Sequence, residues 1–161
     1  MRGECAELVR REHGSRVQTM RTLAIDFGSK RIGLAISDET GTVAQPLGYV
    51  TGGVSEVMRV ATERGAGRLV VGIPRRLDGT ASDQTKRTLD FVAALKRATA
   101  LPVAEWDERL TTAQAERVLL EGDVRRAKRK QKRDQLAATI LLQSYLDAHQ
   151  PLEGHAPSWP Q

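Results

Sequence analysis

The chain has 161 residues, of which 40% are hydrophobic and 28% charged, and its formal net charge is +5. This length and composition are typical of one globular domain and exclude a disordered or low-complexity protein. A single cysteine, Cys5, excludes an intramolecular disulfide and a zinc site built from several cysteines.

The two ends of the chain differ from its centre. Residues 1–20 are charged and carry no trustworthy strand or helix signal, so we expect a disordered or poorly ordered extension before a domain at 21–148. Residues 149–161 contain three prolines and a glycine and predict a flexible tail. No apolar run approaches the ~18 residues of a membrane span. No signal peptide is visible, so the cytoplasm is the expected compartment.

Three short strands are predicted at the start of the domain. The apolar runs 23–26 and 32–37 are separated by a short connection that contains Gly28, a pattern that predicts an antiparallel hairpin. Residues 42–50 predict a third strand, and Pro46 in it is compatible with an edge position.

Helices and strands alternate over the rest of the domain. The periodicity predicts, in order, a helix at about 54–64, a strand buried on both faces at 69–73, a helix at about 82–98, a strand at 103–106, a helix from Thr111 and a last helix at about 133–148. Thr111 and Gln114 form a capping box for the helix that starts there. This order predicts an α/β fold with a five-stranded mixed sheet that is flanked by helices on both faces.

Two acidic positions follow predicted strands. Asp26 comes after three apolar residues, where a carboxylate is costly unless it is paired or bound to a cation. A turn-forming role before Gly28 is the alternative. Asp107 and Glu108 follow the fifth strand, and strand alternation does not decide between them. A charged surface loop is the alternative there.

A third acidic position, Asp134, lies on the last predicted helix. The apolar residues at helical spacing after it are Ala137, Ala138, Leu141, Leu142 and Tyr145. This stripe places Asp134 on the core-facing side of an amphipathic helix. The alternative is that Asp134 lies in the first helical turn and interacts favourably with the helix dipole.

These acidic positions together favour one chemistry. Two strand ends and a helix start could bring three carboxylates to one edge of the sheet. Mg²⁺ and Mn²⁺ prefer oxygen ligands, and two such ions can stabilise the attacking and leaving oxygens of phosphodiester hydrolysis. Water would be the nucleophile, so no Ser, Cys or His nucleophile is needed. The pattern predicts a metal-dependent nuclease.

The positive charge of the chain is concentrated in one segment. Seven of the nine residues from 125 to 133 are cationic, and the rest of the chain has a net charge of −2. They are Arg125, Arg126, Lys128, Arg129, Lys130, Lys132 and Arg133. A solvated charge run is the ordinary explanation, but this basic run directly precedes Asp134 and could deliver a phosphate backbone to the metal site. Because only 4% of the residues are aromatic, recognition of backbone and shape is favoured over a base-stacking platform.

Further cations are candidate nucleic-acid contacts. They are Lys30 and Arg31 in the first hairpin, Arg75 and Arg76 after the fourth strand, and Arg109 beside Glu108. Each could equally be an ordinary solvated loop residue.

Five segments of the chain occur in the order found in a known family. They are Ile25–Gly33, Gly72–Pro74, Asp78–Thr80, Asp107–Thr112, and Lys128–Lys130 with Asp134, Ala137 and Ala138. The set resembles the bacterial YqgF family, also called RuvX, of pre-16S ribosomal RNA nucleases related to the Holliday-junction resolvases. One departure is Ser82, where many relatives have glycine, which puts the shape of this loop in doubt.

The resemblance implies a ribonuclease H-like fold and hydrolysis of nucleic-acid phosphodiesters. Asp26, Glu108 and Asp134 match the family's acidic positions, which favours Glu108 over Asp107 as the third catalytic and metal-binding carboxylate. The expected substrate is the 5′ end of pre-16S rRNA, with Mg²⁺ or Mn²⁺ as cofactor.

Three alternatives stay open. A resolvase-like endonuclease on branched DNA needs two cuts, which a two-fold homodimer would favour. An actin-like or sugar-kinase-like nucleotide-binding protein shares the Asp-x-Gly hairpin, but the chain is too short for two such domains. A nucleic-acid-binding protein without catalysis would not need the carboxylates.

Overall fold

The computed structural model describes residues 20–76, 78–111 and 126–149, and in the last of these segments it describes side chains from residue 136 onwards. In chain order the elements are β1 (Arg21–Phe27), β2 (Ile32–Ser37), β3 (Ala44–Val50), α2 (Val54–Glu63), β4 (Ala66–Ile73), α3 (Asp83–Ala98), β5 (Val103–Asp107), the short 3-10 helix η1 (Glu108–Leu110) and α5 (Arg126–His149). The predictions for residues 1–19, for the helix that starts at Thr111 and for the tail beyond His149 lie outside the described residues.

The strands form one five-stranded sheet in the order β3-β2-β1-β4-β5. β1 pairs antiparallel with β2, and β2 pairs antiparallel with β3, as the hairpin signal predicts. β4 runs parallel to β1, and β5 runs parallel to β4. The predicted mixed sheet is therefore confirmed, and the carboxyl ends of β1, β4 and β5 meet at one end of it.

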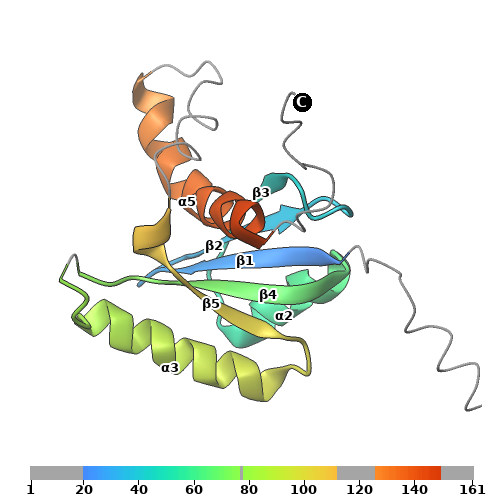
Figure 1. The fold of residues 1–161 in the computed structure, drawn as a ribbon, viewed down its shortest axis with the longest axis horizontal. Coiled ribbons are helices and arrows are strands. Elements are labelled where there is room, and N and C mark those ends of the chain that lie inside the picture. The colour runs from blue at the N-terminus through green and yellow to red at the C-terminus, as the bar shows by residue number, and fades with distance from the viewer. Residues whose placement is uncertain (1–19, 77, 112–125, 150–161) are drawn as a thin grey trace, which may run out of the picture.

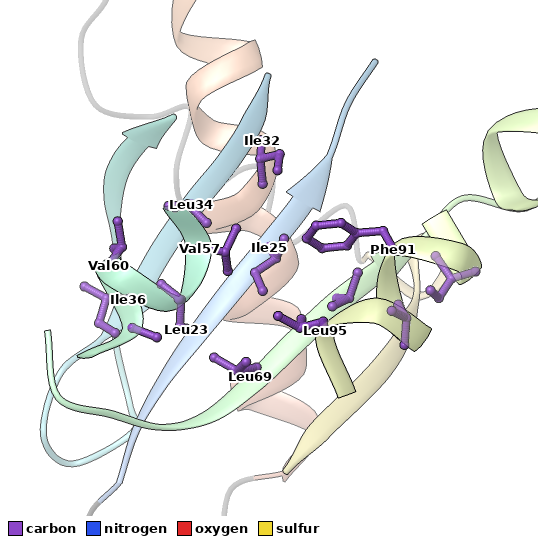
Figure 2. Packing of buried hydrophobic residues seen from close by; sticks show 14 residues of the cluster. Leu23, Ile25, Ile32, Leu34, Ile36, Val57, Val60, Leu69, Phe91 and Leu95 are labelled. Atoms are coloured by element: carbon purple, nitrogen blue, oxygen red, sulfur yellow. The ribbon is translucent and has the colours of Figure 1, made fainter. Parts of the chain in front are cut away.

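One face of the sheet is covered by α2 and α3 (Figure 1). The strands contribute large aliphatic side chains to this core, among them Leu23, Ile25, Leu34 and Leu69, and α3 contributes Phe91 and Leu95. Figure 2 shows these side chains packed against one another between the strands and the two helices. We call this side of the sheet the α2/α3 face.

The opposite face is covered by α5 (Figure 1). Here the strands contribute mostly small residues, Ala24, Ala35 and Ala44, beside Val70, and the helix packs its apolar stripe of Ala138, Leu141, Leu142 and Tyr145 onto them. These four helix residues are buried, as the spacing after Asp134 predicts. Because alanines let the helix approach closely, large side chains on this side, which we call the α5 face, come mainly from the helix.

Two local predictions need correction or completion. The last helix begins at Arg126 and not at about 133, so most of the basic run is helical. Apolar periodicity does not reveal this start, but Lys, Arg, Ala and Gln are good helix formers and nothing in the run stops a helix. Ser82 caps α3: its side chain accepts from the backbone N–H of Thr85 in a capping box. The departure from glycine there gives this loop a defined helix start.

β3 is an edge strand, which agrees with the expectation from Pro46. Its pairing with β2 shifts register between Leu34 and Ala35, so that Leu34 faces Gly48 and Ala35 faces Pro46. Leu47 is therefore the extra residue of a β-bulge.

Within the described part of the chain, no helix is both long and apolar enough to cross a membrane.

Candidate active site

Asp26 lies on the α5 face at the carboxyl end of β1. Its neighbours Leu23 and Ile25 point into the α2/α3 core, whereas Ala24 packs under α5, so alternation places Asp26 on the α5 face. Asp26 pairs with Gly33 of β2. One residue beyond the paired Ile25 and Val71, it also comes level with Gly72 of β4. Asp26 thus has a glycine beside it on each neighbouring strand.

Glu108 lies on the same face at the end of β5. A Cβ atom added at Gly72 would lie 3.1 Å from Oε1 of Glu108 and 2.9 Å from Cδ2 of Leu141, so the carboxylate extends over this glycine. Glu108 is half-buried. Burial and then the negative charges of Asp26 and Asp107 raise the pKa of Glu108 to about 7. The negative charges of Asp26 and Glu108 therefore repel each other unless a cation binds between them or one carboxylate is protonated.

Asp107 has a different role from Glu108. Its side chain accepts a hydrogen bond from the backbone N–H of Arg109 and thereby caps η1. It also forms an ion pair with the Arg109 guanidinium, with 2.7 Å between the closest nitrogen and oxygen. These hydrogen bonds hold the pKa of Asp107 below its usual range. Asp107 is thus engaged structurally, and Glu108 is the carboxylate directed towards Asp26.

Asp134 lies eight residues after the start of α5 at Arg126. It is therefore beyond the first helical turn, and the alternative of a first-turn interaction with the helix dipole is wrong. One turn after it, Ala138 is fully buried on the α5 face, and Leu141, two turns after it, lies over Gly72. The stripe that the sequence predicts after Asp134 thus covers the α5 face, and the role of Asp134 itself stays a prediction. Its side chain is outside the described part.

The loop after β4 lies close to Arg109. In this loop the N–H of Gly79 donates to the carbonyl of Arg76 at 2.8 Å, and Gly79 has φ +86°. The Arg109 guanidinium approaches Gly79. Hydrogen bonds from Thr80 and, to a smaller extent, the charge of Arg109 lower the pKa of Asp78. Hydrogen bonds from Gln84 to the carbonyl of Phe27 and from Thr85 to that of Pro74 attach α3 to the ends of β1 and β4.

The predicted cationic contacts fall into three groups. Lys30, Arg31, Arg75 and Arg76 are exposed, on loops at the same end of the sheet as Asp26 and Glu108. Arg109 is also exposed, but its guanidinium is paired with Asp107. In the basic run the backbone of residues 126–133 is helical, whereas Arg125 and the side chains of the run lie outside the described part.

The described residues fit part of a divalent-metal site. Asp26 and Glu108 supply hard oxygen donors, and their mutual repulsion is the feature that a divalent cation would relieve. No group of three or more His, Cys, Asp or Glu that could hold a metal occurs among the residues whose side chains are described. Asp134, the third carboxylate that the sequence predicts, lies on α5, and its side chain is outside the described part.

Sequence reasoning missed the two glycines beside Asp26. Gly33 and Gly72 lie in apolar strands, where a glycine usually signals a weakened strand or a close approach. Their spacing gives no sign that they flank the same aspartate, because that relation depends on the pairing of β1 with both β2 and β4. The signal that could have found them is a glycine at the same end of the sheet as Asp26 on each of the two neighbouring strands.

Comparison with known protein families and relatives gives consistent results. A family model described as "RuvX: Holliday junction resolvase" matches residues 20–148. A protein of Thermoanaerobacter pseudethanolicus, described as "Putative pre-16S rRNA nuclease", is 42% identical over 80% of this chain and 97% of its own length. A protein of Symbiobacterium thermophilum with the same description is 43% identical over 80% of this chain and 93% of its own.

The fold is also found among solved structures. RuvC of T. thermophilus in complex with a Holliday junction substrate superposes with a TM-score of 0.54 at 15% sequence identity. The match covers 80% of this chain and 94% of that protein. At this identity the comparison shows the fold, which is the ribonuclease H-like fold that the sequence implies.

Proposed function

The chain belongs to the RuvX family, and on this premise we propose that it is a divalent-metal-dependent nuclease of the cytoplasm that processes the 5′ end of pre-16S rRNA. The observation that carries the proposal is the meeting of Asp26 and Glu108 on the α5 face, over Gly72, at the end of the sheet where cationic loops gather. The descriptions of the relatives as pre-16S rRNA nucleases support this substrate.

Asp26, Glu108 and Asp134 would hold the metal, as Mg²⁺ or Mn²⁺. When bound, such ions supply positive charge that stabilises the attacking and leaving oxygens of a phosphodiester during hydrolysis. β1 carries Asp26, and η1 carries Glu108 directly after β5, so both carboxylates are attached to one sheet before the substrate arrives. Gly33 and Gly72 contribute no side chain on either side of Asp26, and the Glu108 carboxylate extends over Gly72 towards Asp26.

The exposed cations would hold the substrate. Lys30 and Arg31 follow β1, and Arg75 and Arg76 follow β4, so a phosphate backbone that crosses the site passes both loops. The basic run adds seven cations to the segment that leads to Asp134. Backbone neutralisation of this kind positions a nucleic acid without reading its sequence.

The first experiment compares cleavage of two substrate classes. Labelled pre-16S 5′ fragments and a four-way DNA junction, with a linear duplex as control, are incubated with the protein in Mg²⁺, Mn²⁺ or chelator. Asp26→Asn is tested beside Asp90→Asn, which removes an exposed carboxylate of α3 on the other side of the sheet. We expect metal-dependent cleavage of the RNA that only Asp26→Asn abolishes.

The other outcomes separate the competing functions. Preferred cleavage of the junction would favour a resolvase-like endonuclease, which the family description supports. Binding without cleavage under any metal would contradict the nuclease proposal and favour a non-catalytic binding protein. Tight ATP binding would favour the nucleotide-binding alternative.

The basic run is tested by the salt dependence of binding. Replacing Lys128, Arg129 and Lys130 with Ala should reduce the slope of log K against log salt by about 2–3, because each phosphate contact contributes about 0.7–0.9. The matched control removes three exposed cations from α3, namely Lys86, Arg87 and Arg97. An equal change in slope for both triple variants would mean that the basic run has no special contact with phosphate.

A further inference from the structure

An exposed aromatic side chain lies in the same row of the sheet as Asp26. Tyr49 of β3 pairs with Gly33 of β2, and Gly33 pairs with Asp26 of β1. Residues that pair directly across strands point to the same face, so Tyr49 and Asp26 both lie on the α5 face. Two strand spacings separate them, which is about 10 Å. The residue between them, Gly33, is buried and contributes no side chain to the row.

The ring of Tyr49 is half open to solvent. It is 49% exposed, and it is the only aromatic residue among the three exposed large hydrophobic side chains of the described part, beside Val43 and Leu110. The Arg31 guanidinium lies over the ring, with 4.9 Å from its central carbon to the ring centroid. Arg31 is itself exposed, on the connection that follows Asp26 and β1.

The pairing of an aromatic ring with an arginine has two explanations. Aromatic residues are common in strands, and a cation over a ring is a favourable surface contact in its own right. The position beside the carboxylates argues for more, because a tyrosine ring and a guanidinium plane are the two surfaces on which proteins stack unpaired bases. The low aromatic content excludes an extended stacking platform, but it leaves room for a single stacking position.

We propose that Tyr49 and Arg31 hold one unpaired nucleobase beside the phosphate that is cleaved. The proposal rests on the nuclease function above and adds a preference to it. A nucleotide next to the cut must leave its stack to reach Tyr49, so the protein binds single-stranded or flexible sites better than a continuous duplex. Arg31 would contact both the base and the backbone, because its guanidinium offers a stacking surface for the base and a positive charge for the neighbouring phosphate.

The test measures stacking directly. Short single-stranded oligonucleotides, in RNA and DNA versions, carry the fluorescent base 2-aminopurine at each position in turn, and the same strands are also annealed to their complements. Full-length protein with Asp26→Asn keeps the strands uncut. Tyr49→Ala and Tyr49→Phe are introduced into this protein, with Val43→Ala as the control because Val43 is equally exposed just before the other end of β3.

We expect quenching of 2-aminopurine at one position of the single strand. Tyr49→Ala should abolish the quenching and weaken single-strand binding ~5- to 150-fold, the range that stacking of one base on an aromatic ring corresponds to. Tyr49→Phe should restore both, and Val43→Ala should change neither. Binding of the annealed duplex should stay within about twofold for all variants, since paired bases do not reach the ring.

Three results would overturn the proposal. They are an equal loss of single-strand and duplex binding in Tyr49→Ala, an effect of Val43→Ala of the same size, and quenching that persists without Tyr49. The cleavage assay keeps this failure distinct from failure of the nuclease proposal. Asp26-dependent cleavage without a stacking signal overturns the stacking position alone, and a stacking signal without any cleavage overturns the nuclease function alone.

Discussion

The two faces of the sheet are built from the same strands but have opposite compositions. On the α2/α3 face, β1 contributes Leu23 and Ile25, which are fully buried in a core of large aliphatic side chains. On the α5 face, the same strand contributes Ala24 and then Asp26, and the neighbouring strands contribute glycine beside it. The comparison teaches that the α2/α3 face is apolar along the whole strand, whereas the α5 face combines a second core with charge at the end of the strand.

The largest expected effect comes from the α5 face. Asp26→Asn keeps the size of the side chain but removes the charge that would hold a metal, which contributes several kcal/mol to transition-state stabilisation. We expect at least ~10³-fold slower cleavage. Thermal unfolding should change little, and nucleic-acid binding should be retained. An equal loss of cleavage, binding and folding would mean that Asp26 has a structural role.

Its neighbour on the other face should behave in the opposite way. Ile25 is fully buried in the α2/α3 core. Ile25→Ala should lower the free energy of unfolding by about 3 kcal/mol, through lost burial and a residual cavity. Under conditions where the variant is folded, its turnover should stay close to that of the unchanged protein. Denaturant titration and the cleavage assay together check this. A large loss of turnover in the folded variant would mean that the α2/α3 face also contributes to cleavage.

Gly72→Ala places a methyl group between a core residue, Leu141, and the candidate catalytic residue Glu108. The added Cβ would lie 2.9 Å from Leu141 and 3.1 Å from the Glu108 carboxylate, so one of them must move. We expect turnover to fall ~10- to 100-fold because a catalytic group is displaced. The cost in stability should be about 1–2 kcal/mol. In the control Gly67→Ala, at the other end of β4, the close atoms belong to the flexible Met20 side chain, and turnover should be unchanged.

The smallest expected effect is on the pH dependence of stability. The pKa of Glu108 is about 7 in the folded protein, against an ordinary value of 4.5. Between these values the folded protein holds a proton that the unfolded chain has released, so its stability falls as the pH rises from 4.5 to about 7. Without added metal, Glu108→Gln should therefore stabilise the protein at pH 8 by ~1–2 kcal/mol, after allowance for solvent screening.

Unfolding measured against pH checks this last prediction. The gain from Glu108→Gln should disappear near pH 4.5, where both states of the unchanged protein carry the proton. Asp107→Asn is the contrasting variant, because the hydrogen bonds of Arg109 lower the pKa of Asp107. That substitution should reduce stability at neutral pH. A stabilising effect of Asp107→Asn would mean that the two neighbouring carboxylates have exchanged roles.

The sequence predicts most of the fold because each strand and helix has its own periodic signal. The alternation in β1 and the stripe after Asp134 are local patterns, and the structure confirms the elements they predict. The start of α5 was predicted too late because a run of cations has no apolar period. The choice between Asp107 and Glu108 depends on how β5 ends, and a 3-10 turn directly after the strand is not visible in alternation.

The candidate site depends on relations between strands, which local patterns do not contain. Gly33, Gly72 and Tyr49 come from three different strands and matter only because pairing sets them in one row with Asp26. In the sequence, Tyr49 is an ordinary strand residue near a proline. The carboxylates could be predicted because charge at the end of an apolar run is conspicuous, whereas the residues that flank them on neighbouring strands carry no local signal.

The bulge and the proline of β3 also limit how the protein can associate. An exposed edge strand is a template on which another chain can add a strand, and long flat edges promote aggregation. Here Pro46 has no N–H to donate, and the extra residue Leu47 bends the ladder at the same place. A second copy therefore finds no continuous row of hydrogen-bonding groups along this edge. Growth of extended sheets by addition of strands to β3 is therefore disfavoured.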